Sequence, residues 1–142
     1  MSAKLTTEPI DVAALLERSR HPASGAVVLF LGTVREMSEG RAVVGLEYEA
    51  YPSMAVAKLT EIVAEANARW PLHHAEVVHR FGPMEVGDVA VALTASSTHR
   101  AEAFDAGRWI MDEIKRSAPI WKQEQWADGG ADWVHPPQEA MN

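Results

Sequence analysis

Residues 96–124, SSTHRAEAFDAGRWIMDEIKRSAPIWKQE, combine a strong helix pattern with a strand pattern across one proline. An apolar stripe at helical spacing predicts a helix over about 99–116. The stripe consists of Ala103, Gly107, Ile110, Met111 and Ile114. Pro119 then ends the helix, and the IWKQEQW that follows is typical of a β-strand. Lys115 at the helix end and Lys122 in the strand therefore lie on either side of the break, only seven positions apart.

The rest of the chain carries further helix and strand patterns. The apolar run at 25–35 predicts a buried strand that ends at Gly32, and the polar segments 36–42 and 83–87 are typical of connecting loops. The remaining predicted elements are helices over 6–20 and about 52–69, strands over 43–51, 75–82 and 88–97, and a hairpin that joins 120–126 to 132–134 through the turn ADGGA.

This order of elements predicts an α+β protein, because helices and strands mix without strict alternation. The 142 residues fit one domain, 1–142, with no linker or internal repeat. Residues 1–7 and 135–142 are predicted to be loose termini. The six elements over 43–126 run βαββαβ, which is the order of a ferredoxin-like sandwich, although order alone does not fix the strand pairing.

The composition argues against several classes of function. The formal net charge is −7, whereas general nucleic-acid binding needs a basic surface. No secretory type of leader is seen at the N-terminus, and no apolar run approaches the roughly 20 residues needed to cross a bilayer. We therefore expect a soluble cytoplasmic protein that binds neither nucleic acid nor membrane.

The chain contains no cysteine, which excludes disulfides, thiolate nucleophiles, carriage of sulfur as a persulfide and cysteine metal sites. His73 and His74 follow a proline turn, but no third ligand has convincing spacing, so we predict no metal site. His79 stands in a strand pattern beside Arg80 and is expected to be a packed or surface residue.

Positive charge gathers around the opening stretch. Five of the thirteen Lys and Arg residues lie within it, namely Arg100, Arg108, Lys115, Arg116 and Lys122. His99 and Arg100 stand at the start of the helix, where unpaired backbone N–H groups favour an anion and an arginine fork grips phosphate. Alternatively, Ser97 or Thr98 caps the helix while His99 and Arg100 face water.

Lys115 and Lys122 have two possible readings. A strand that returns past the helix end would bring both ammonium groups into one pocket, where like charge and partial burial lower a lysine pKa. A neutral amine is a nucleophile or a base, and a cationic amine is an acid or an electrostatic clamp. The alternative is a pair of ordinary solvated lysines.

Arg35 is a further candidate because it directly follows the apolar strand, and Gly32 before it lets the backbone approach a ligand. The alternative is that Arg35 only opens an exposed loop.

In this order and spacing, several motifs together resemble the large, catalytic subunit family of molybdopterin synthase over roughly residues 8–134. They are GAVVLFLGTVRE, LEYEAYPSMA, RWPL, VVHRFG, GD, the stretch SSTHRAEAFDAGRWIMDEIKRSAPIWKQE and a closing W-V. The resemblance implies an α/β-hammerhead-type fold within the α+β class and a homodimer. It also implies that each subunit binds a small ubiquitin-like protein with a C-terminal Gly-Gly thiocarboxylate, which gives a heterotetramer.

The implied activity is that of a sulfurtransferase without a cofactor of its own. It converts cyclic pyranopterin monophosphate (precursor Z) into the dithiolene of molybdopterin, in molybdenum cofactor biosynthesis. The missing cysteine fits this reaction, because a chain without a thiol needs a partner to deliver the sulfur.

The resemblance also assigns roles to residues of this sequence. Lys115 and Lys122 are the implied catalytic residues, with Lys115 the stronger candidate as nucleophile or proton shuttle. Phe30 and Met111 are implied as apolar lining. The implied substrate-binding set is Thr33, Val34, Arg35, His99, Arg100, Lys115, Lys122, Gln123 and Glu124, with His99 and Arg100 holding the substrate phosphate, from the same or the other protomer.

A binding module that holds an anionic metabolite or a partner's tail without catalysis is the rival interpretation. The two differ in geometry: an enzyme requires Lys115, Lys122 and Arg35 to point into one cleft.

Overall fold

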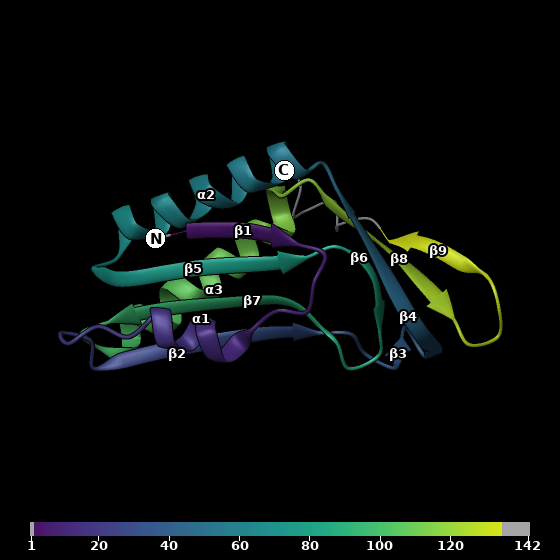
Figure 1. The fold of residues 1–142 in the computed structure, drawn as a ribbon, viewed down its shortest axis with the longest axis horizontal. Coiled ribbons are helices and arrows are strands. Elements are labelled where there is room, and N and C mark those ends of the chain that lie inside the picture. The colour runs from purple at the N-terminus through teal and green to yellow at the C-terminus, as the bar shows by residue number, and fades with distance from the viewer. Residues whose placement is uncertain (1, 135–142) are drawn as a thin grey trace.

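The computed structural model describes residues 2–134, which form two β-sheets and three helices. The larger sheet has the strand order β1-β5-β7-β2 (Figure 1). Its strands are β1 (Ser2–Thr6), β2 (Ala26–Thr33), β5 (Leu72–Arg80) and β7 (Val89–Ser97). β1 runs parallel to β5, and the other two pairs are antiparallel. No helix within residues 2–134 is both long and apolar enough to cross a membrane.

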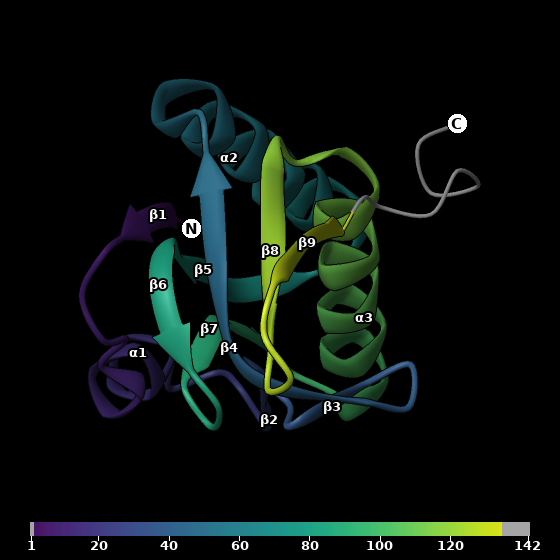
Figure 2. The same ribbon diagram turned by 90° about the vertical axis from the view of Figure 1, so that its right-hand side faces the viewer.

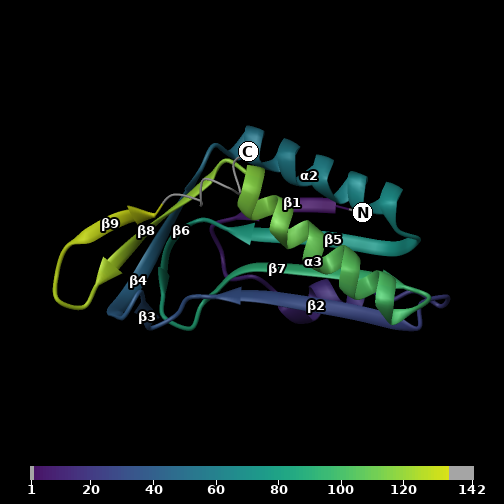
Figure 3. The same cartoon turned by 180° about the vertical axis from the view of Figure 1, so that it is seen from behind.

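Helices cover both faces of the larger sheet. They are α1 (Val12–Arg18), α2 (Pro52–Arg69) and α3 (Arg100–Ser117). α2 and α3 lie together on one face and α1 lies on the other (Figures 1 and 3). Side chains alternate along β5, so Val77 packs under α2 and α3 while Val78 packs with Leu15 of α1. Both faces are therefore buried, as in a three-layer α/β/α arrangement.

The smaller sheet stands at one end of the larger one (Figure 2). It contains β3 (Met37–Ser38), β4 (Arg41–Ala50), β6 (Gly82–Glu85), β8 (Ile120–Trp126) and β9 (Ala131–Val134). β4 pairs with β8 along most of its length and with β6 on its other edge. The turn between β8 and β9 uses Gly129 and Gly130 at positive φ, as the predicted hairpin requires.

The α+β prediction is confirmed, whereas the ferredoxin-like alternative is wrong. Its six elements do occur in the predicted order, as β4, α2, β5, β7, α3 and β8. However, β4 pairs with β8 in the smaller sheet and β5 pairs with β7 in the larger one, and β4 does not pair with β7, which would be needed to join all four strands into one ferredoxin-like sheet. The two-sheet arrangement is thus set by pairing between distant segments, which element order does not contain.

Three local predictions also need correction. Residues 2–6 are not loose, because they form β1 in parallel pairing with β5. The predicted loops at 36–42 and 83–87 contribute β3 and part of β6 to the smaller sheet. β2 is an edge strand, not a buried one, and exposes Val27, Phe30 and Leu31. The predicted loose segment 135–142 lies outside the described residues.

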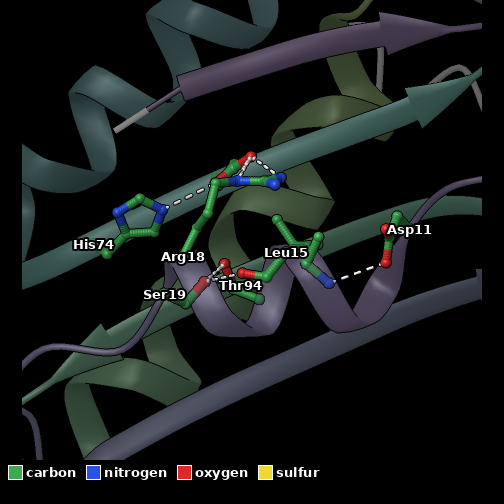
Figure 4. A network of polar contacts seen from close by, with 8 residues as sticks. Asp11, Leu15, Arg18, Ser19, His74 and Thr94 are labelled. Carbon is green, nitrogen blue, oxygen red and sulfur yellow. Dashed lines mark hydrogen bonds and ion pairs between the residues drawn. The ribbon is translucent and has the colours of Figure 1, made fainter.

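The short helix α1 is fastened to the sheet by polar contacts (Figure 4). Arg18 Nε and Nη2 donate to the carboxylate of Glu76 on β5 over 2.6–3.1 Å, and His74 Nε2 lies 3.0 Å from the same carboxylate. Burial alone would raise the pKa of Glu76, but these hydrogen bonds outweigh it and hold the pKa below its usual value. Ser19 Oγ adds contacts to Leu15 O and Thr94 Oγ1.

Candidate active site

A cavity of about 380 Å³ lies where the C-terminal end of α3 meets β8 and the end of the larger sheet. Its lining combines cations, rings and apolar side chains. Among the lining residues are Arg35, Lys115, Lys122, Thr33, Phe30, Met111, Tyr48 and His79. The helix α3 brings Lys115, the strand β8 that follows it brings Lys122, and the distant Arg35 follows β2, so three elements supply one positive site.

The surroundings of Lys122 shift its protonation equilibrium toward the neutral amine. Burial lowers its pKa, Glu124 opposes this, and the positive charges of Arg35 and Lys115 lower it further. The cause is the one anticipated from the sequence, namely like charge combined with partial burial. The structure therefore brings Arg35, Lys115 and Lys122 into one cleft, which is the geometry required of an enzyme.

A smaller cavity of about 50 Å³ continues from the first and shares Thr33, Arg35, Tyr48 and Lys122 with it. Glu124 lines this annex and is only 3% exposed. Its Oε1 accepts a hydrogen bond of 2.9 Å from Ser38 Oγ and lies 3.8 Å from Lys122 Nζ. Its Oε2 has no hydrogen-bond partner within residues 2–134. A buried carboxylate oxygen without a donor is costly, and a ligand N–H could satisfy it.

Four of the residues predicted for the site do not line either cavity. The side chain of Val34 is buried in the core beside Val43 and Leu46. Its backbone N–H donates a hydrogen bond to Asp88 O, with 2.9 Å between nitrogen and oxygen. Gln123 occupies the opposite face of β8 from Lys122, because side chains alternate along a strand.

His99 and Arg100 are both exposed and lie at the opposite end of α3 from Lys115. With a rise of 1.5 Å per residue, Arg100 and Lys115 are about 22 Å apart along the helix. Figure 3 shows this end of α3 at the side of the larger sheet away from the smaller sheet. Within one protomer these two residues therefore cannot share a ligand with the lysine pair.

Tyr48 and His79 are the cavity residues that the sequence patterns did not single out. Tyr48 pairs with Lys122 across β4 and β8, so both side chains stand on the same face. The Tyr48 and His79 rings meet edge to face, with centroids 5.1 Å apart. Burial, followed by the charge of Glu124, raises the pKa of Tyr48 against the opposing effect of Arg35, so the phenol is neutral at ordinary pH.

His79 is 5% exposed, and burial lowers its pKa to about 4 against the opposing effect of its hydrogen bond to the Arg80 backbone. A signal for His79 was present, because it continues the inward-facing series Ala75 and Val77 on β5. The prediction that His79 is a packed or surface residue is confirmed for the packed alternative, and its place in the cavity wall adds to it. Within residues 2–134, no group of three or more potential ligand side chains is arranged to hold a metal ion.

Comparison with known proteins identifies the family. The family described as MoaE protein matches residues 5–117 of this chain. The chain belongs to the MoaE family. A protein named molybdopterin synthase catalytic subunit, from Halalkalibacterium halodurans, is 43% identical to this MoaE-family chain over 127 residues, which cover 89% of this chain and 81% of that protein.

Solved structures share the fold of this MoaE-family chain. The crystal structure of molybdopterin synthase from Staphylococcus aureus matches with a TM-score of 0.86 and 42% identity, covering 92% of this chain and 94% of that chain. A chain from the complex of subunits 1 and 2 of molybdopterin-converting factor from Helicobacter pylori has a TM-score of 0.74 at 18% identity. That match covers 96% of this chain and 90% of the other, and it shows the fold alone.

Proposed function

We propose that this chain is the catalytic subunit of a molybdopterin synthase. It is a sulfurtransferase that moves sulfur from the C-terminal thiocarboxylate of a small ubiquitin-like subunit to cyclic pyranopterin monophosphate. Two such transfers build the molybdopterin dithiolene. The observation that carries the proposal is the convergence of Arg35, Lys115 and Lys122 on one cavity.

Charge explains why this reaction needs such a cavity. The substrate brings a phosphate and the partner brings a thiocarboxylate, and two anions in contact repel by several kcal/mol in a site of low dielectric constant. Cations fixed in place before the ligands arrive offset this repulsion without reorganisation. The chain itself cannot carry the sulfur, because it has no cysteine.

Within the cavity, Lys115 is the stronger catalytic candidate and acts as a nucleophile or a proton shuttle. Lys122 supports it: its lowered pKa gives it more of the neutral amine near neutral pH than a solvated lysine has. Thr33, Arg35 and Glu124 contact the substrate from the cavity and its annex. Phe30 and Met111 supply apolar wall against the pterin ring.

His99 and Arg100 belong to the proposal only if a second protomer supplies them. The edge strand β2 exposes Val27 and Leu31 on the face turned to α1, and α3 on its other face exposes Phe104; apolar surface on both sides of this edge supports a homodimer contact there. We place the phosphate grip of Arg100 in the partner protomer's cavity. Two protomers and two small subunits then form the heterotetramer, in the cytoplasm.

Mixed dimers test this sharing of residues. Lys115→Ala and Arg100→Ala are each expected to be inactive alone. In a random mixture of the two, about half of the dimers are mixed, and each has one site free of both changes, so about a quarter of wild-type activity returns. Activity that stays at the level of the separate variants would show that Arg100 does not act across the dimer.

Reconstitution tests the proposed function itself. Purified protein, precursor Z and a thiocarboxylated small subunit are mixed, and molybdopterin is measured. The proposal expects product with the wild type and none with Lys115→Ala that still folds and binds the partner. If both proteins bind precursor Z and neither forms molybdopterin, the chain is a binding module and the proposal is wrong.

A further inference from the structure

The cavity contains many hydrogen-bond donors and few acceptors. Arg35, Lys115 and Lys122 can only donate while they are charged, and they suit the anionic groups of a ligand. A pterin also carries ring N–H groups, which need acceptors when the ring leaves water. Within the main cavity, His79 is the side chain whose protonation state fixes it as an acceptor.

The hydrogen bond between His79 Nδ1 and the backbone determines this protonation state. Nδ1 lies 2.8 Å from the carbonyl oxygen of Arg80. A carbonyl oxygen only accepts, so Nδ1 must carry the proton. In a neutral ring, Nε2 is then left with a free lone pair, and no residue within 2–134 hydrogen-bonds to it.

The surroundings hold the ring in this orientation. His79 is almost fully buried, the Tyr48 ring packs edge to face against it, and Val91 faces it across the pairing of β5 and β7. Burial lowers the pKa of the ring, and the charged groups around it are the cations Arg35, Lys115 and Lys122 of the cavity and Glu124 of the annex. The ring therefore stays neutral at ordinary pH and keeps its acceptor.

We propose that His79 Nε2 accepts a hydrogen bond from a ring N–H of the bound pterin and so fixes the orientation of the ring in the cavity. This inference rests on the proposed function, and it makes His79 a substrate-positioning residue. The cations then select the phosphate, His79 selects the heterocycle, and the two together orient the reacting carbons toward the lysines.

Two amide substitutions separate this role from a structural one. In His79→Gln the amide can reach the place of Nε2, whereas in His79→Asn it can reach only the place of Nδ1. The measurement is the Kd for precursor Z by calorimetry, together with KM and kcat for molybdopterin formation. We expect His79→Asn to raise Kd and KM by about tenfold and His79→Gln by only about threefold. His74→Asn, on the same strand but the other face, is the matched control and should bind like the wild type.

A second ligand keeps the test valid if overall affinity shifts. Inorganic phosphate as a competitive inhibitor should bind the wild type and His79→Asn equally, because the cations and not His79 hold phosphate. Equal affinity of wild type, Gln and Asn variants for precursor Z, or better binding by Asn than by Gln, would overturn the inference while leaving the proposed function intact. A wild-type protein that does not bind precursor Z would overturn both.

Discussion

Two buried glutamates on the two sheets experience opposite electrostatic surroundings. Glu76 on β5 is 5% exposed, and both of its oxygens accept hydrogen bonds from Arg18, with His74 beside them (Figure 4). Glu124 on β8 is 3% exposed, but only one oxygen has a hydrogen-bond partner within residues 2–134. The hydrogen bonds of the fold therefore satisfy both oxygens of Glu76, whereas one oxygen of Glu124 is left to accept a hydrogen bond from a bound ligand.

The same contrast holds for the cations and the histidines. Around Glu76, opposite charges pair, so the fold favours the charged forms and the pKa of Glu76 falls. Near Glu124, burial lowers the pKa values of both His79 and Lys122, and the positive charges of Arg35 and Lys115 lower that of Lys122 further against the opposing charge of Glu124. Charged residues at the α1 side therefore stabilise the fold, whereas those in the cavity cost stability and are available for chemistry. Four predictions test this difference between the two sites.

The largest effect is expected from the cavity lysines. Lys115→Ala and Lys122→Met should each lower the kcat for molybdopterin formation by a hundredfold or more, about 3–4 kcal/mol, because an aligned charge in a closed site is lost. Lys122→Met should change the free energy of unfolding little, since it removes a desolvated cation beside Arg35 and Lys115 but also the ion-pair partner of Glu124, and the two effects oppose each other. Lys58→Ala, on the outer side of α2, is the control with unchanged kcat. Normal activity in either cavity variant would show that the charges in the cavity are not needed for the reaction.

Acid should lower the free energy of unfolding by protonating His79. Its pKa is about 4 in the folded protein and 6.5 when unperturbed, so the unfolded chain binds more protons between these values. Stability is then lost as the pH falls from 6.5 toward 4, by about 3 kcal/mol. Urea unfolding at pH 7 and pH 4 should show a smaller loss for His79→Gln than for the wild type. Equal losses would mean that His79 is not buried in its neutral form.

A smaller loss is expected at the paired site. Arg18→Met leaves the Glu76 carboxylate with His74 as its remaining partner and should lower the free energy of unfolding by about 2 kcal/mol at pH 7. Molybdopterin formation should be unchanged, which is the mirror image of Lys122→Met. Urea unfolding and the product assay measure the two quantities. A variant with normal stability but low activity would assign Arg18 to function instead.

The smallest effect should come from Ser38→Ala. This change removes the hydroxyl that donates to Glu124 Oε1, so that Lys122, 3.8 Å away, is the remaining partner of this oxygen within residues 2–134. Stability should fall by about 1 kcal/mol, and the Kd for precursor Z should change by a few fold at most. A loss as large as that of Arg18→Met would show that Glu124 is a paired structural charge like Glu76.

The sequence contained much of the site and less of the fold. A shared pocket for Lys115 and Lys122 could be predicted from the sequence, because the proline between them ends the helix and the strand that follows can return past the helix end. The edge position of β2 and the strand β1 could not be foreseen, since both depend on pairing with β5 and β7 and not on local pattern. Local apolar content is the same for an edge strand and a buried one.

Among the cavity residues, too, some could be predicted from local sequence and others depend on contacts between distant segments. Residues next to a break, such as Arg35, were detectable from the sequence. Tyr48 was not, because its contact with His79 arises from the meeting of two sheets, and the alternation along β5 showed only that His79 points inward. Val34 and Gln123 do not line the cavity for a simpler reason. Each directly follows a cavity residue in the sequence, Thr33 or Lys122, and its side chain points to the opposite side.

A crystal structure of the protein soaked with precursor Z would show directly whether the pterin binds between the lysines. We expect density for the pterin in the cavity between α3 and β8, with its phosphate within hydrogen-bonding distance of Arg35, Lys115 or Lys122 or of Arg100 from the second protomer. Precursor Z found only elsewhere on the protein, with the cavity occupied by water alone, would contradict this expectation.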